Sequence, residues 1–415
     1  MKQRLIIKPP SLPIHASILP PASKSISNRL LILQSIFPGN IEIQNLSEAQ
    51  DSLLLRKLLG DISNHHDNNI ALVLDCENAG TVCRFLTALL AITKGVYIID
   101  GSPRMKERPI APLVDALKSI GATIEYIEKQ AYLPIKIIGG ELTKGNITLD
   151  ASLSSQFVSA LLMILPKLKQ GTQLIYQSPV STPYIYMTLK LMQDMGMKFE
   201  LDNNSISCNL NLIKPSVFFV ETDWSSAAYW YQMVAFSPGS KVYIKGLKAD
   251  SLQGDSKLME VFETLGVKSV FDENGLHLQH TGEVQENEVY EMGDFPDIVP
   301  SIAVTCAALN ITASINGIAH LRQKESDRVK ALVKEISKFH CNIKATLNSI
   351  LITSSQHKFT KPLSFETYND HRIAMSMAPL ALLFEEVEIQ DAEVVKKSYP
   401  HFWSDLKKAG FSLKG

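Results

Sequence analysis

Two cations and several hydroxyl groups precede an apolar run in the stretch PPASKSISNRLLILQSI, residues 20–36. The prolines favour an extended chain, and a serine can then cap a helix that begins near Ile26. Ser25 and Arg29 are spaced to share one face of that helix. Free N–H groups at a helix start favour an anion, and Lys24 and Arg29 add charge, so the stretch indicates a phosphate or carboxylate site. A capped helix with two surface cations is the alternative.

Further clusters of charge stand where helices can begin. The segment PRMKERPI holds three cations, and Pro109 follows them in a position to begin a helix. In KESDR, Lys324 and Arg328 are four residues apart and should share one helical face, with Glu325 between them in sequence. Each cluster alone also fits a solvated surface. Together the helix openings supply seven cations, which suit two separate phosphate or carboxylate groups: Lys24, Arg29, Arg84, Arg108, Arg328, Arg372 and Lys397.

Two carboxylates, Asp297 and Glu325, are placed among these cations to move protons. A carboxylate in a cleft dense with cations should stay ionised, so Asp297 is suited to act as a general base. The sequence lacks the P-loop pattern G-x-x-x-x-G-K-S/T, the dinucleotide fingerprint G-x-G-x-x-G, the G-x-S-x-G elbow and a spaced His/Cys metal set. We therefore expect two anionic substrates, handled without a nucleotide, a metal ion or a covalent nucleophile.

The composition of the chain narrows its class. A length of 415 residues favours two domains, and 45% hydrophobic residues predict a folded chain. The 41 basic and 42 acidic residues nearly cancel, which argues against a nucleic-acid or membrane-surface partner. The N-terminus resembles neither a signal nor a transit peptide, and no apolar stretch is long enough to span a membrane. The five scattered cysteines fit thiols in a reducing cytoplasm: Cys76, Cys83, Cys208, Cys306 and Cys341.

The candidate residues lie where helices are expected to begin, in segments that resemble one another. Each segment has a small or polar cluster followed by a mostly apolar run. Six such openings lie near residues 24, 80, 155, 225, 297 and 370. Amphipathic helices follow most of them, and glycines stand at the ends of three, Gly121, Gly196 and Gly266, with His340 in the corresponding place of a fourth. The pattern predicts six βαβαββ-like modules, three to a domain. A large α/β protein whose helices resemble one another by chance is the alternative.

A set of motifs over nearly the whole chain resembles the 5-enolpyruvylshikimate-3-phosphate synthase family. The motifs, in the family's order, are ASKSISNR, NAGT, PRMKERPI, SSQF, STPYI, PDIVPSIA, KESDR, NDHRIAM and KSYP. The resemblance implies an α/β fold with two similar domains, each of three βαβαββ units around buried helices (an inside-out α/β barrel), and an active site in the interdomain cleft. Domain I would be residues 1–20 and 222–415, and domain II residues 21–221.

The resemblance also implies a reaction, transfer of the enolpyruvyl group of phosphoenolpyruvate to the 5-hydroxyl of shikimate 3-phosphate, with release of phosphate and no cofactor. Asp297 would be the base, and Glu325 or Lys24 would protonate the methylene carbon. Shikimate 3-phosphate would be bound by Lys24, Ser25, Arg29, Ser154, Ser155, Gln156, Ser181, Tyr184, Asp297 and Lys324. Phosphoenolpyruvate would be bound by Lys24, Asn78, Gly80, Arg108, Gln156, Arg328, Arg372 and Lys397. A cytoplasmic monomer is expected.

Four departures from the family pattern concern fine geometry. Ala22 replaces the usual glycine, Phe85 the usual proline, and His320 an asparagine found in some members, while Asp51 lacks the paired aspartates that usually precede it. One rival is the sister enzyme that uses UDP-N-acetylglucosamine, but RMKERPI lacks its loop cysteine. An RNA-end-processing relative should be more basic. A non-catalytic anion-binding module would gain nothing from carboxylates among its cations.

Overall fold

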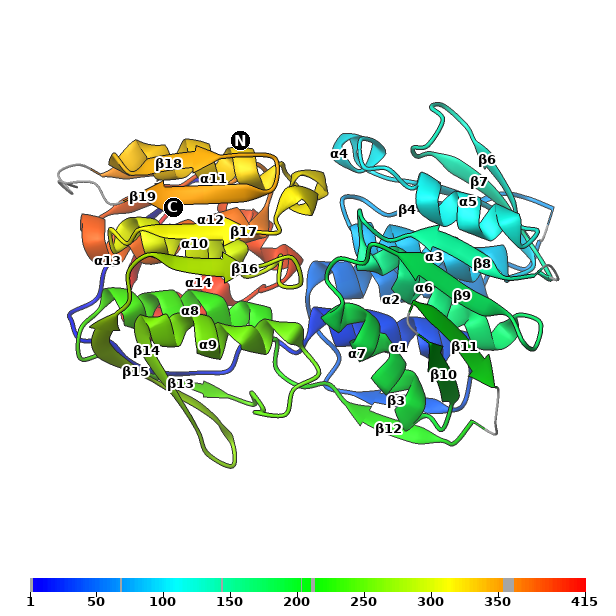
Figure 1. Ribbon diagram of the computed structural model, residues 1–415, viewed down its shortest axis with the longest axis horizontal. Coiled ribbons are helices and arrows are strands. Elements are labelled where there is room, and N and C mark those ends of the chain that lie inside the picture. The colour runs from blue at the N-terminus through cyan, green and yellow to red at the C-terminus, as the bar shows by residue number, and fades with distance from the viewer. Residues whose placement is uncertain (1–2, 68, 143–144, 203, 210–212, 354–361) are drawn as a thin grey trace. The chain divides into compact units, whose positions relative to one another are not determined.

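The computed structural model describes residues 3–67, 69–142, 145–202, 204–209, 213–353 and 362–415. The chain divides into two compact units. Unit 1 comprises Met1–Ser23, Glu48–Gln50 and Glu221–Gly415, and unit 2 comprises Lys24–Ser47 and Asp51–Val220. Figure 1 gives the element labels used below. Among the described residues, no helix combines the length and the apolar character that crossing a bilayer requires.

Unit 1 contains three four-stranded sheets within its described residues, with the strand orders β14-β15-β13-β2, β16-β17-β19-β18 and β20-β21-β1-β22. Their strands are β1 (Leu5–Lys8), β2 (His15–Ile18), β13 (Lys241–Lys245), β14 (Leu265–Phe271), β15 (Gly275–Val284), β16 (Glu288–Glu291), β17 (Ala313–Asn316), β18 (Asn342–Ala345), β19 (Ser349–Thr353), β20 (Leu363–Phe365), β21 (Val387–Ile389) and β22 (Ser412–Lys414).

Unit 2 contains two four-stranded sheets, β4-β5-β7-β6 and β10-β11-β9-β8, and the two-stranded sheet β12-β3, again within the described residues. Their strands are β3 (Ile41–Gln44), β4 (Leu72–Asp75), β5 (Gly95–Asp100), β6 (Thr123–Tyr126), β7 (Ile135–Gly139), β8 (Ile147–Asp150), β9 (Gln173–Gln177), β10 (Lys198–Asp202), β11 (Ser205–Asn209) and β12 (Ser216–Phe219).

In two sheets the parallel pairs, β13 with β2 and β12 with β3, join strands that are far apart in sequence. The other four sheets share one connectivity. A parallel pair of strands flanks a buried helix, as in β16 and β17, and an outer helix then leads to two antiparallel strands, as in β18 and β19. In unit 1 the N-terminal strand β1 completes the last sheet, between β21 and β22. The sheet β12-β3 is an exception to the predicted module, because the chain passes from α2 to β4 through residues 64–71 and forms no further strands among its described residues there.

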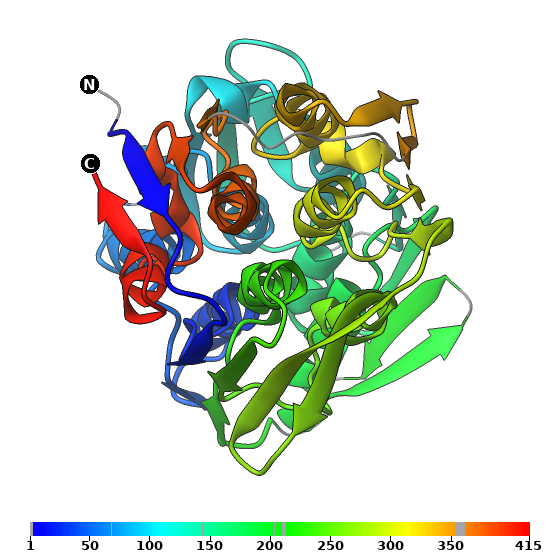
Figure 2. The same ribbon diagram turned by 90° about the vertical axis from the view of Figure 1, so that its left-hand side faces the viewer.

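Three mostly apolar helices form the centre of each unit, and sequence predicted all six of them. A helix that is apolar on all sides is stable only when protein surrounds it. In unit 1, α8, α10 and α12 contact one another and every one of their residues is buried. Figure 2 shows these three helices nearly end-on, with strands outside them. The central helices are α1 (Lys24–Ile36), α3 (Gly80–Ala91), α6 (Ser155–Ile164), α8 (Trp224–Phe236), α10 (Val299–Ala308) and α12 (His371–Met377).

The remaining helices lie farther from these centres or in connections. The longer ones are α2 (Gln50–Ser63), α5 (Ala111–Ser119), α7 (Pro183–Asp194), α9 (Leu258–Thr264), α11 (Arg328–Ile336) and α14 (Phe402–Lys408). The short ones are α4 (Pro103–Lys106), α13 (Ala381–Phe384) and the 3₁₀ segments η1 (Leu165–Lys167), η2 (Gly254–Lys257), η3 (Ala319–Gln323), η4 (Ser337–Phe339), η5 (Ala378–Leu380) and η6 (Ala392–Lys397).

The residues predicted to follow the C-terminal ends of four helices are confirmed, and two predicted helix starts are wrong. Gly121, Gly196 and Gly266 have positive φ angles after α5, α7 and α9, and His340 has φ +59° after η4. Helix α1 begins at Lys24 rather than near Ile26. Pro109 does not begin a helix, since Ile110 caps α5 and Pro112 lies in its first turn.

Candidate active site

The guanidinium group of Arg328 lies at the centre of an ion-pair network in unit 1. Its Nη1 atom is 3.0 Å from Asp297 Oδ1, its Nη2 atom 2.8 Å from Glu325 Oε2, and its Nε atom 2.9 Å from Asp370 Oδ2. The Arg328 side chain is only 1% exposed. Burial alone would lower the pKa of Arg328, but Asp370, Glu325 and Asp297 together raise it above the ordinary value. Arg328 therefore remains charged at any physiological pH.

Arg372 also binds Asp297, through both of its terminal nitrogen atoms. Its Nη2 atom is 2.7 Å from Asp297 Oδ2, and its Nη1 atom donates to the Asp297 carbonyl oxygen at 3.1 Å. Asp297 precedes α10, while Arg372 lies in the first turn of α12, whose N-cap Asp370 accepts from the Arg372 backbone N–H. Two helix starts therefore hold one carboxylate between two guanidinium groups.

The second carboxylate, Glu325, also pairs with two cations. Besides its bond to Arg328, it lies 3.7 Å from the ammonium group of Lys397. The prediction that Lys324 and Arg328 share a helical face is wrong, because α11 begins only at Arg328 and Lys324 caps η3. Asp327 caps α11 by accepting from the Lys330 backbone N–H at 3.0 Å, and this cap fixes where the helix begins.

Two further ionisable groups in unit 1 have strongly shifted pKa values. Burial, and then the charge of nearby Asp297, raises the pKa of Asp255 to about 7. Ser225, at the start of α8, donates to this carboxyl group. Burial, and then the Lys324 charge, lowers the pKa of His320 to about 3, so this histidine is neutral at neutral pH. Its Nε2 atom has no hydrogen-bond partner among the described residues.

In unit 2, Arg29 is held by three helices. Its Nε atom donates to Thr188 Oγ1 at 2.7 Å, its Nη1 atom to the Ser25 carbonyl at 2.9 Å, and its Nη2 atom to Ser159 Oγ and the Tyr184 carbonyl. Burial lowers the pKa of Arg29 to about 10, which leaves the group charged at neutral pH. In this conformation four of its five N–H bonds have protein acceptors, so at most one remains for a ligand.

The first turns of α3 and α6 meet through Gln156. Arg84 Nη1 lies 2.5 Å from Gln156 Oε1, and Gln156 Nε2 donates to Thr81 Oγ1 at 2.9 Å. Ser154 caps α6 by accepting from the Gln156 backbone N–H. The amide of Gln156 is therefore fixed by the neighbouring helix.

Gly80 allows the close approach of another cation, Arg108. A Cβ atom at Gly80 would lie 2.4 Å from Arg108 Nη2. Arg108 itself is 2% exposed, and its Nη1 atom is 3.5 Å from the Asn78 carbonyl oxygen. Elsewhere in unit 2, the Lys24 ammonium lies 3.4 Å from Asp51 Oδ2. Asp51, before which the family's usual paired aspartates are missing, therefore forms an ion pair with Lys24.

Ser181 combines two features that are typical of ligand-binding positions. Its φ angle of +55° lies in the left-handed region, which is unfavourable for serine. Its side chain is buried, and the Oγ atom has no hydrogen-bond partner among the described residues. Strained residues and orphan polar atoms concentrate at functional sites, so Ser181 is a candidate for binding an anion.

The predicted site residues divide between the two units, and the residues of each unit form one group below. The unit 2 group contains Lys24, Ser25, Arg29, Asn78, Gly80, Arg84, Arg108, Ser154, Ser155, Gln156, Ser181 and Tyr184. The unit 1 group contains Asp297, Lys324, Glu325, Arg328, Arg372 and Lys397. Sequence reasoning missed residues that hold these side chains through hydrogen bonds, namely Thr81, Ser159 and Thr188. A polar residue within an apolar buried helix, as at Ser159, was the available signal.

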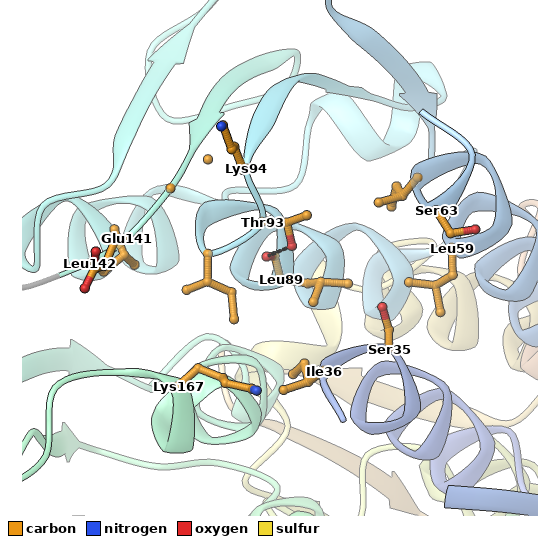
Figure 3. A pocket seen from close by; sticks show the side chains of 14 residues that line it. Ser35, Ile36, Leu59, Ser63, Leu89, Thr93, Lys94, Glu141, Leu142 and Lys167 are labelled. Atoms are coloured by element: carbon orange, nitrogen blue, oxygen red, sulfur yellow. Dashed lines mark hydrogen bonds between the residues drawn. The ribbon is translucent and has the colours of Figure 1, made fainter. Parts of the chain in front are cut away.

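A cavity of about 850 Å³ lies in unit 2 away from the unit 2 group. Figure 3 shows its lining at the C-terminal ends of α1, α2 and α3, including Ser35, Ser63 and Leu89. The Thr93 hydroxyl there already donates to the Leu89 carbonyl at 2.8 Å. The candidate residues lie instead at the N-terminal ends of α1 and α3, where the helix dipole favours anions.

The chain is similar over nearly its whole length to proteins of one family. A family model described as EPSP synthase (3-phosphoshikimate 1-carboxyvinyltransferase) matches residues 9–406. A 3-phosphoshikimate 1-carboxyvinyltransferase of Bacteroides fragilis is 41% identical over 414 residues, covering 99% of each chain. One of Haemophilus influenzae is 35% identical over 423 residues, covering 95% of this chain and 96% of its own. An EPSP synthase structure from Acinetobacter baumannii shares the fold, with a TM-score of 0.77 at 20% identity and 100% of both chains covered. The chain belongs to the EPSP synthase (3-phosphoshikimate 1-carboxyvinyltransferase) family.

Proposed function

We propose a division of labour among the residues of this chain for the reaction of its family. The chain is an enzyme of the shikimate pathway, and it transfers the enolpyruvyl group of phosphoenolpyruvate to the 5-hydroxyl of shikimate 3-phosphate. The observation that carries the residue assignment is the position of Asp297, whose carboxylate lies between the guanidinium groups of Arg328 and Arg372. A carboxylate beside two cations places a proton acceptor next to groups that can bind an anionic substrate.

The ligands assigned to phosphoenolpyruvate in this proposal are mostly cations. In unit 1 these are Arg328, Arg372 and Lys397, and the phosphate oxygens of the substrate can replace carboxylates as their acceptors. Exchange of partners frees Asp297 to take the proton of the 5-hydroxyl. In unit 2 the ligands are Lys24, Asn78, Gly80, Arg108 and Gln156. The close approach of Arg108 to Gly80 supports a shared role for these two residues.

Shikimate 3-phosphate is bound chiefly by unit 2. Its phosphate is assigned to Ser154, Ser155 and Ser181, and the orphan buried hydroxyl of Ser181 supports this part. Its carboxylate is assigned to Ser25 and Arg29, where the single uncommitted N–H bond of Arg29 limits that residue to one contact in the present conformation. The remaining ligands are Lys24, Gln156, Tyr184, Asp297 and Lys324.

The chemical steps balance as an addition followed by an elimination. The 5-oxygen attacks C2 of phosphoenolpyruvate as Asp297 takes its proton, and a proton adds to the methylene carbon. Loss of phosphate and of a methyl proton then gives the enol ether. Glu325 and Lys24 are both candidates to protonate the carbon. In the substrate-free conformation Glu325 pairs with Arg328 and Lys397.

We further propose that units 1 and 2 are the two domains expected from the sequence, with limits at residues 20/21 and 221/222. A cytoplasmic monomer belongs to the same proposal. The five cysteines are free and buried, which supports a reducing compartment. Light scattering during gel filtration tests the monomer, and a mass near twice 46.0 kDa would contradict it.

The residue assignment is tested by binding and turnover of single variants. Ser181→Ala removes a hydroxyl assigned only to shikimate 3-phosphate, so it should raise the KM for that substrate on the order of tenfold and leave the KM for phosphoenolpyruvate nearly unchanged. Lys397→Met should do the reverse. Equal shifts of both constants in both variants would contradict the division of ligands.

A further inference from the structure

Gln156 is held in one amide orientation by two residues of α3. Its Oε1 atom lies 2.5 Å from Arg84 Nη1, and its Nε2 atom donates to Thr81 Oγ1 at 2.9 Å. A guanidinium group only donates hydrogen bonds, so the amide atom that faces Arg84 must be the oxygen. Contacts within the protein therefore fix which end of this amide faces a ligand.

The guanidinium group that holds Gln156 is buried. Arg84 is 5% exposed, and its guanidinium lies 5.0 Å from the centroid of the buried Phe157 ring. Thr81 and Arg84 are three residues apart in α3, so they lie on the same side of that helix. Gln156 lies in the first turn of α6, whose backbone is fixed by the Ser154 cap. Two helices thus fix both the backbone and the side chain of Gln156.

This arrangement makes Gln156 a donor toward substrates. A glutamine amide has two N–H bonds, and Thr81 accepts one of them. The second is left for a ligand, while the carbonyl oxygen is engaged by a cation. Phosphate and carboxylate oxygens only accept, so they need the NH₂ end. A flipped amide would instead present its oxygen to an anion and would lose the bond.

We propose that Arg84 is a positioning residue that keeps the NH₂ group of Gln156 turned toward the two anionic substrates. This inference rests on the proposed function, in which Gln156 contacts both phosphoenolpyruvate and shikimate 3-phosphate. Arg84, counted from sequence among the anion-binding cations, acts through Gln156 instead. Removal of Arg84 should therefore affect both substrates, as removal of the Gln156 amide does.

A double-mutant cycle tests this coupling. Arg84→Met keeps an unbranched side chain over Phe157 and removes the donors, and Gln156→Ala removes the amide. We expect each change to lower kcat/KM for both substrates on the order of tenfold or more, and the double variant to lie within about threefold of Gln156→Ala. Losses that multiply would show that Arg84 acts independently of Gln156, and a rise in the KM of phosphoenolpyruvate alone would make Arg84 a direct ligand. Either result overturns the inference.

Controls separate positioning from folding and from the proposed function. Arg56→Met removes an exposed arginine of α2 and should leave kinetics unchanged. Arg84→Lys keeps a cation with a single donor group, so it should recover part of the loss, and it replaces Arg84→Met in the cycle if that variant fails to fold by circular dichroism. Wild-type protein without enolpyruvyl transfer would refute the proposed function. Active wild-type protein with multiplying losses would refute only the role of Arg84.

Discussion

Asp297→Asn removes the proposed base and leaves the two arginines that contact it in the chain. The carboxylate accepts bonds from Arg328 at 3.0 Å and from Arg372 at 2.7 Å, and its side chain is 21% exposed. An asparagine keeps one acceptor oxygen but turns an NH₂ group toward guanidinium donors. Loss of the positioned proton acceptor should lower kcat by about 100-fold or more, equivalent to about 2.7 kcal/mol of barrier. The weakened ion pair should lower the free energy of unfolding by about 1–3 kcal/mol.

The KM for phosphoenolpyruvate gives the sharper part of this prediction. In the wild type, the substrate must replace Asp297 as the partner of Arg328 and Arg372. The asparagine competes less for these cations, so the KM for phosphoenolpyruvate should stay constant or fall while kcat falls. Steady-state phosphate release and urea unfolding measure the two effects.

Asp370→Asn is the matched control. Asp370 also pairs with Arg328, but it is completely buried and caps α12. We expect Asp370→Asn to lower the free energy of unfolding more than Asp297→Asn does, and to lower turnover less. Turnover of Asp297→Asn within tenfold of wild type, or a larger loss in the control, would refute the assignment of Asp297 as the base.

Three further changes test neighbouring parts of the site. Gly80→Ala should push the Arg108 guanidinium away and raise the KM for phosphoenolpyruvate several-fold, because the new Cβ atom would lie 2.4 Å from Arg108 Nη2; an unchanged KM would remove Arg108 from that substrate. Thr188→Val leaves the Arg29 Nε–H without its acceptor, so urea unfolding should give a loss of about 1–3 kcal/mol, and equal stability would contradict the network. Burial raises the pKa of Asp255 to about 7 from 3.8, so the folded state keeps a proton that the unfolded state has released between these pH values. The stability of wild type relative to Asp255→Asn should therefore fall by up to about 1.4 kcal/mol per pH unit from pH 4 to 7 and level off above it, and a flat difference across urea unfolding at pH 5, 6, 7 and 8 would contradict this.

The helices that carry the site could be predicted because their signals are local. A small or polar cluster before an apolar run marks a capped helix that must be buried, and all six predicted openings begin such helices. The start of α11 was misplaced because η3 and the Asp327 cap compete with a longer helix. The pairing of β12 with β3 could not be foreseen from a repeat, since β12 comes from the far end of unit 2 in sequence.

The partners of the charged groups are long-range and left no local signal. Arg328 pairs with Asp370 across 42 residues, and Arg29 bonds to Thr188 across 159 residues. Sequence spacing identifies neighbours within one helix only. It could therefore show where cations lie in the sequence, but not which residues form hydrogen bonds or ion pairs with them. The resemblance to a family supplied the chemistry that these distances could not.

Phosphorus NMR of the purified chain with both substrates tests the central claim most directly. Phosphoenolpyruvate and shikimate 3-phosphate together should give inorganic phosphate and the enolpyruvyl ether in equal amounts. Either substrate alone should give neither product, and UDP-N-acetylglucosamine should not replace shikimate 3-phosphate. Phosphate release without shikimate 3-phosphate, or transfer to the nucleotide sugar instead, would contradict the account.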